Sequence, residues 1–148
     1  MKNTVIIIPA RLAAKRLPNK PLAKIKGLPM IVHVVNRAKE SKIGEVVVAT
    51  PDQEIVEVVK KNGSQAILTQ HDHSTGSDRI HEVYKKNFSN SSDLIINLQG
   101  DMPNIDSSSI SNLEKHMRKN NSDIGTLASH LEKKDINDPN VVKVQVEE

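Results

Sequence analysis

The sequence contains no cysteine, and this absence excludes two classes of site. Without thiols the chain cannot form the disulfide framework that holds small secreted domains together, and it cannot build a thiolate metal site. Residues 1–4 lead directly into a strand-like segment without a small-residue cleavage site, which argues against a secretory signal. We therefore expect a cytoplasmic protein.

Aromatic side chains and long apolar runs are also scarce. Tyr84 and Phe88 are the only aromatic residues, so the chain lacks the stacking platforms on which single-stranded nucleic acid binds. No apolar run approaches the roughly 20 residues that span a bilayer. The net charge of +3 is compatible with nucleic acid, an anionic membrane surface or a small anionic substrate. We expect the small anionic substrate, with neither nucleic acid nor membrane as a partner.

What the sequence does contain is an alternation of apolar patterns over 148 residues, a length typical of one soluble domain. Short β-branched or apolar runs predict buried strands at 5–8, 45–50, 65–69 and 93–98. Amphipathic stretches predict helices at 30–39, at 52–63 with Asp52 as the capping residue, from Ser77 or Asp78 through Tyr84, and at 107–120. Two further strands are expected at 124–131 and 141–146.

Strands separated by helices of this length imply right-handed crossovers and a mostly parallel sheet that is covered on both faces. The expected fold class is therefore α/β, with three α/β/α layers around a mostly parallel, Rossmann-like sheet. Ligands of such sheets bind outside the carboxyl ends of the strands. The loops after the first, third and fourth strands are thus the places where a site is expected.

The loop after the first strand, residues 9–21, concentrates positive charge. It carries Arg11, Lys15, Arg16 and Lys20 where the chain leaves the sheet. A polyphosphate is held well by such a set, because guanidinium groups make bidentate contacts and a lysine is a compact point charge. The loop is neither a P-loop nor a glycine-rich dinucleotide fingerprint. On composition alone, a solvated basic loop is an equally good interpretation.

The loop after the fourth strand reads Gln-Gly-Asp-Met-Pro at 99–103. The carboxylate of Asp101 is suited to hold Mg²⁺, which bridges phosphate oxygens and offsets the charge that develops in phosphoryl transfer. Gly100 lets the backbone come close to a ligand. The alternative for this segment is a plain turn, since Gly-Asp and Met-Pro both favour turns.

The segment between the third strand and the next helix, residues 71–79, allows three interpretations. His71 and His73 have the spacing of zinc ligands but no identified third ligand. A helix-capping turn explains the same residues without any ligand. In the third interpretation, Thr75 and Gly76 offer hydroxyl and backbone groups to the edge of a base, and Arg79 adds a further contact.

The order of these signals is more specific than any one of them. The motifs, in chain order, are Ile-Pro-Ala-Arg at 8–11, Arg-Leu-Pro-Asn-Lys-Pro-Leu at 16–22, Gly-Leu-Pro-Met-Ile at 27–31, Asp-His-Ser-Thr-Gly-Ser-Asp-Arg at 72–79 and Asn-Leu-Gln-Gly-Asp-Met-Pro at 97–103. This series resembles the 3-deoxy-manno-octulosonate (Kdo) cytidylyltransferases, the CMP-Kdo synthetases of lipopolysaccharide biosynthesis. The likeness runs from Val5 to Val144 and includes the run Asp-Pro-Asn-Val-Val-Lys-Val at 138–144.

The resemblance implies a reaction and a fold of the nucleotide-diphospho-sugar transferase type. CTP and Kdo would give CMP-Kdo and diphosphate, with the anomeric hydroxyl of Kdo attacking the α-phosphorus. It further implies that Arg11, Arg16 and Lys20 hold the triphosphate. Asp101 would bind Mg²⁺, which screens the phosphate charge.

The resemblance also assigns residues to the two substrates. Ala10, Thr75, Gly76 and Arg79 would shape the cytosine pocket. Gln99 would lie towards the sugar acid. All of these positions agree with the loops at which a parallel sheet is expected to bind ligands.

The chain departs from the family pattern at three positions and in its extent. Ala14 stands where the family usually has Ser, Asn19 where it has Gly, and Met102 where it has Glu. Family chains continue beyond the length of this one, into much of the Kdo pocket, a second metal-binding Asp and the contacts of a homodimer. The resemblance thus predicts that residues 1–148 are a CTP-binding nucleotidyltransferase domain that ends before the sugar-acid and dimerisation part. Two alternatives stay open: a transferase for another sugar acid, and a non-catalytic nucleotide-binding remnant or a subunit completed by another chain.

Overall fold

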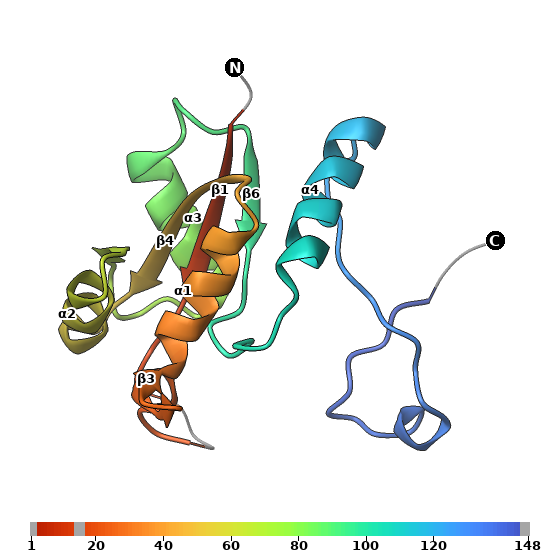
Figure 1. The fold of residues 1–148 in the computed structure, drawn as a ribbon. Coiled ribbons are helices and arrows are strands. Elements are labelled where there is room, and N and C mark those ends of the chain that lie inside the picture. The colour runs from red at the N-terminus through yellow and green to blue at the C-terminus, as the bar shows by residue number, and fades with distance from the viewer. Residues whose placement is uncertain (1–2, 14–16, 146–148) are drawn as a thin grey trace.

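The structure is a computed structural model that describes residues 3–13 and 17–145. Its main sheet has four parallel strands in the order β5-β4-β1-β6, with β1 in the centre (Figure 1). The strands are β1 (Thr4–Pro9), β4 (Gly44–Thr50), β5 (Gln65–Leu68) and β6 (Leu94–Asn97). Each overlaps a strand predicted from the sequence to within two residues at either end, which confirms the parallel sheet.

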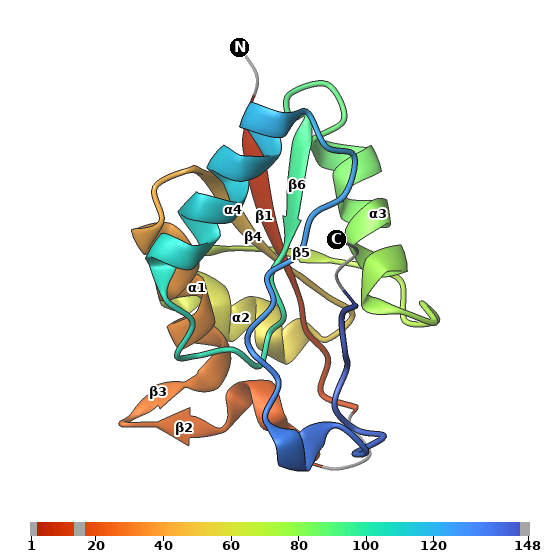
Figure 2. The ribbon, with the colours of Figure 1, turned by 90° about the vertical axis from the view of Figure 1, so that its right-hand side faces the viewer.

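Helices cover both faces of this sheet (Figure 2). They are α1 (Met30–Glu40), α2 (Gln53–Lys61), α3 (Gly76–Asn87) and α4 (Ser107–Asn120). Side chains of β1 alternate between two cores: Ile6 and Ile8 pack with α1, α2 and α4, and Val5 and Ile7 pack with α3. The predicted three-layer α/β/α architecture is confirmed. No helix in the described part of the chain is long and apolar enough to cross a membrane.

A small hairpin between β1 and α1 was not predicted. Strands β2 (Lys24–Ile25) and β3 (Leu28–Pro29) pair antiparallel, directly after the 3₁₀ helix η1 (Lys20–Leu22). Strands of two residues are too short to produce a periodic apolar pattern. The backbone N–H of Met30 donates to the carbonyl of Ala23 at 2.8 Å, so the hairpin fixes where α1 begins.

The expectation of strands at 124–131 and 141–146 is wrong for the described residues. Residues 122–145 form no strand, and the 3₁₀ helix η2 (Lys133–Asp135) is their only helical element. Most of their apolar side chains stay exposed, with Ile124 90% and Val142 92% accessible. An apolar run becomes a strand only where a neighbouring strand pairs with its backbone. Here the segment 123–127 faces β6 across a cavity of about 700 Å³.

A polar cluster fastens α4 to the beginning of the sheet. Arg118 donates to the hydroxyl of Thr4 at 2.7 Å, to Asp93 at 3.3 Å and to Glu114. The Thr4 hydroxyl in turn donates to Glu114 at 3.1 Å. Hydrogen bonds to Asp93 and then to Glu114 raise the pKa of Arg118. The cluster therefore holds β1, β6 and α4 together at the end of the sheet opposite to the ligand-binding end.

Candidate active site

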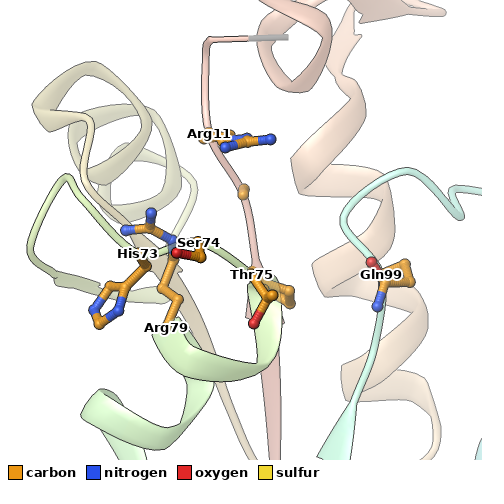
Figure 3. Close-up of a pocket in the computed structure, with 9 residues that line it drawn as sticks. Arg11, His73, Ser74, Thr75, Arg79 and Gln99 are labelled. Carbon is orange, nitrogen blue, oxygen red and sulfur yellow. The ribbon is translucent and has the colours of Figure 1, made fainter.

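A cavity of about 220 Å³ opens at the carboxyl ends of the strands, where three loops meet (Figure 3). Six of the predicted site residues line it: Ala10, Arg11, Thr75, Gly76, Arg79 and Gln99. Pro9, His73 and Ser74 complete the wall and were not predicted as site residues. Arg16, another predicted site residue, lies outside the described residues. The fold thus brings together segments that are up to 90 positions apart in the sequence.

The loop after β1 is anchored on either side of Arg11. The N–H of Ala10 donates to the carbonyl of Ala49 at 3.0 Å, and the N–H of Leu12 donates to a carboxylate oxygen of Asp52 at 2.8 Å. Arg11 itself is exposed, and its guanidinium extends into the open space between the loops (Figure 3). Because its two neighbours are fixed, this cation is presented to a ligand with little loss of backbone entropy.

Asp52 has a different role from the one that the sequence suggested. It stands at the N-cap position of α2, as predicted, but its side chain makes no capping hydrogen bond. The carboxylate binds the N–H of Leu12 instead, 40 positions earlier in the chain. An Asp before a helix favours a local cap in any sequence analysis, so this contribution to the site could not have been found without the fold.

The amino-terminal end of α3 forms the second wall. Thr75 is its N-cap, two residues before Ser77, the earlier of the two predicted starts. The hydroxyl oxygen of Thr75 accepts from the N–H of Asp78 at 3.1 Å, and the Asp78 carboxylate accepts from the N–H of Thr75 at 3.1 Å. This capping box lowers the pKa of Asp78, chiefly through the hydrogen bond from the Thr75 side chain. The positive end of the α3 dipole therefore borders the cavity and favours an anionic or electron-rich ligand group.

Arg79 adds a second positive charge, but it is not held out to the solvent. It is 3% exposed, and its guanidinium donates to the hydroxyl of Thr69 and to the carbonyl of Gln70, the latter at 2.8 Å. Burial, followed by the nearby charge of Arg11, lowers the pKa of Arg79. Two guanidinium groups that repel each other across a cavity make a site that an anion would stabilise.

The loop after β6 carries Gln99, Gly100 and Asp101. A Cβ added to Gly100 would lie 2.8 Å from the carbonyl oxygen of Pro9, so glycine allows this loop to approach the end of β1. The Gln99 amide donates to the side-chain oxygen of Asn97 at 3.0 Å. Gly100 therefore keeps the loops after β1 and β6 in contact, and its role in admitting a ligand stays a prediction.

Lys20 and Asp101 form an ion pair between these two loops. The ammonium nitrogen lies 2.8 Å from a carboxylate oxygen, and the side chains are 39% and 53% exposed. Both groups are therefore within reach of a ligand, although neither lines the cavity. An exposed pair of this kind is weak, with a typical contribution of about 0.2–1 kcal/mol. A ligand with stronger charges can separate it.

The pKa of Glu82 leads to a prediction about stability. Hydrogen bonds from His73 and then from Lys86 lower the pKa of this carboxyl from 4.5 to about 2. Because the pKa is lower in the folded state, the carboxylate stabilises the fold above pH 4.5, and this stabilisation is lost as the pH falls from 4.5 towards 2. The difference in the free energy of unfolding between the wild type and Glu82→Gln, measured with urea, should shrink as the pH falls below about 4.5. A difference independent of pH would contradict the ion pairing.

Comparison with known proteins finds relatives along nearly the whole chain. A family model described as "Cytidylyltransferase" matches residues 5–148. The 3-deoxy-manno-octulosonate cytidylyltransferase of Rhodospirillum centenum is 45% identical over 99% of this chain and 58% of its own length. That of Brucella ovis is 46% identical over 95% of this chain and 57% of its own length. The chain thus spans somewhat more than half the length of these relatives.

A solved structure extends the likeness to three dimensions. It is a CMP:2-keto-3-deoxy-manno-octonic acid synthetase complexed with CTP, 43% identical in sequence, with a TM-score of 0.77 over 82% of this chain and 49% of that one. A cytidylyltransferase from Leptospira borgpetersenii shares the fold at 28% identity, with a TM-score of 0.69 over 81% of this chain and 50% of that one.

Proposed function

Since this chain belongs to the cytidylyltransferase family, we propose that it forms the CTP-binding part of an enzyme that couples CTP to Kdo, with CMP-Kdo and diphosphate as products. The observation that carries the proposal is the cavity beside β1, where Arg11, Arg79 and the amino-terminal end of α3 converge. Its chemistry fits a nucleotide, and relatives at about 45% identity carry that activity in their names. We further propose a cytoplasmic enzyme that acts as a homodimer.

In the proposed complex the triphosphate lies along the loop after β1. Arg11 and Lys20 contact its phosphates, and Arg16 belongs to the same loop. The cytosine lies against Ala10 and the turn at 74–76. Because the Thr75 hydroxyl is engaged in the capping box, we expect the turn to recognise the base mainly through its backbone.

The reaction itself is a substitution at phosphorus. A bond forms between the anomeric oxygen of Kdo and the α-phosphorus, the bond from that phosphorus to the bridging oxygen breaks, and diphosphate leaves while the hydroxyl loses its proton. Catalysis of such a step relies on positioning and on electrostatic stabilisation of the phosphate oxygens. Arg11 and Lys20 would supply the charge, and Gln99 would lie on the side of the sugar acid.

The residues present fit Mg²⁺ as a proposed cofactor. Asp101 offers an exposed carboxylate beside Lys20, and no group of three or more metal-binding side chains occurs in the described ranges. Mg²⁺ is commonly bound by one or two carboxylates, with substrate phosphates and water as its other ligands. We propose Asp101 as the protein ligand. When bound, the ion would offset charge on the triphosphate.

Thermal unfolding with Mg²⁺ and each of the four nucleoside triphosphates tests the nucleotide assignment. A ligand that binds only the folded state raises the unfolding temperature. We expect CTP to raise the unfolding temperature by about 8 °C at a hundredfold excess over its Kd, and ATP, GTP and UTP to have much smaller effects. A chain that unfolds cooperatively but shows no shift with CTP would overturn the proposal. Formation of CMP-Kdo after addition of Kdo then tests the acceptor.

A further inference from the structure

The loop between β5 and α3 provides much of the cavity wall but has little apolar anchorage. Of residues 70–74 only His73 is even half-buried, and the others are exposed. At its start the N–H of Thr69 donates to the carbonyl of Thr50 at 2.8 Å, and at its end stands the Thr75 cap. The four residues before Ser74 therefore need other contacts to keep one conformation.

Two side chains of α3, one helical turn apart, supply these contacts. Arg79 donates to Thr69 and Gln70, as described above. Glu82, which carries the opposite charge, contacts the same segment. One of its carboxylate oxygens accepts from the N–H of Gln70 at 3.1 Å and lies 2.5 Å from Nε2 of His73. A cation and an anion on α3 thus hold adjacent polar groups of the loop.

Glu82 itself does not border the cavity. Its side chain is 11% exposed and does not line the cavity, whereas His73 does. In Figure 3 the His73 ring points away from the space between Arg11, Thr75 and Gln99. His73 therefore contributes to the wall through its position in the loop, and the partner that fixes its ring is Glu82.

We propose that Glu82 is a positioning residue for base recognition, which acts through Gln70 and His73 to keep the 70–74 loop in the shape that receives the cytosine. The inference rests on the proposed function, because it assigns the base to this cavity. Its physical basis is pre-organisation: a loop that is already ordered loses less conformational entropy when the nucleotide binds. The triphosphate is held by a different loop and should not depend on Glu82.

The test compares two ligands that share the phosphate chain. Binding of Mg²⁺·CTP and of Mg²⁺ with inorganic triphosphate is measured by calorimetry for the wild type and for Glu82→Gln. We expect the substitution to weaken the binding of CTP by about 10-fold. The affinity for inorganic triphosphate should stay within about twofold of the wild-type value. The preference for CTP over UTP should shrink in the same variant. Amide hydrogen exchange at Gln70 should become faster, because its N–H loses a charged acceptor.

Lys86→Gln is the matched control. Lys86 also pairs with Glu82, at 2.6 Å, but its side chain is 64% exposed and contacts the other carboxylate oxygen. This variant should bind CTP as the wild type does. If Glu82→Gln fails to fold, Glu82→Asp replaces it, because it keeps the charge but shortens the reach to Gln70 and His73.

Two results would overturn the inference. One is an unchanged affinity for CTP in the Glu82 variant. The other is an equal loss of affinity for CTP and for inorganic triphosphate, which would indicate a general structural role. A wild-type chain that does not bind CTP at all would instead contradict the proposed function. Failure of the positioning role and failure of the nucleotide assignment are therefore distinguishable.

Discussion

Replacing Asp101 by Asn is expected to change CTP binding in opposite directions with and without Mg²⁺. With Mg²⁺ present, the variant should bind CTP on the order of 100-fold more weakly, because the proposed carboxylate ligand of the metal is lost. With the metal chelated, it should bind CTP about threefold more tightly than the wild type. There are two reasons. Lys20, which lies 2.8 Å from Asp101, is then free to contact the phosphates, and the carboxylate that would repel them is gone.

Calorimetric titration with CTP in Mg²⁺ and in EDTA checks both halves of this prediction. Glu45→Gln is the control, since it removes an exposed carboxylate at the beginning of β4, the end of the sheet opposite to the site. That variant should behave as the wild type in both buffers. Equal weakening of Asp101→Asn in the two buffers would mean that Asp101 supports the loop and does not bind the metal. CMP-Kdo formation by the variant should fall in parallel with the loss seen in Mg²⁺.

The sequence predicted the centre of the sheet well because its two inner strands, β1 and β4, are buried on both faces. A run such as Val5–Ile8 is apolar at every position, which in a soluble protein is typical of a strand covered on both faces. The same reasoning failed for 124–131 and 141–146. Their apolar patterns are real, but a strand also needs a neighbouring strand to pair with, and that depends on the fold rather than on the segment.

The sequence predicted which loops form the candidate site, but it did not predict the contacts between their side chains. The rule that ligands bind at the carboxyl ends of parallel strands places the loops at 9–21, 71–79 and 99–103 in one region, and the structure brings residues of all three together. The ion pair of Lys20 with Asp101 joins positions 81 apart, which no local pattern reveals. The contact of Glu82 with Gln70 could not be predicted for another reason. An acidic residue on an amphipathic helix usually faces the solvent, so the sequence gives no sign of a loop contact.

A substitution at Gly44 is expected to have the largest effect on stability. Gly44 pairs with Thr4 at the start of the β1–β4 ladder, and a Cβ added there would lie 1.9 Å from the carbonyl oxygen of Thr4. The obstacle is backbone in the central strand, so a rotamer change cannot relieve it. We expect Gly44→Ala to lower the free energy of unfolding by roughly 3 kcal/mol, out of the 5–15 kcal/mol typical of a domain.

The consequences of Gly44→Ala extend from the β1–β4 ladder to α4. Thr4 also carries the hydroxyl that links Glu114 and Arg118, so separating β1 from β4 at this point loosens the hold on α4 as well. Urea unfolding measures the effect, with Glu45→Ala as a neighbouring control that should change the free energy by no more than about 0.5 kcal/mol. A loss below 1 kcal/mol for Gly44→Ala would contradict the close approach of the two strands. Because the clash lies at the end of the sheet opposite to Arg11, the folded fraction of the variant should still bind CTP with wild-type affinity, which separates a stability residue from a site residue.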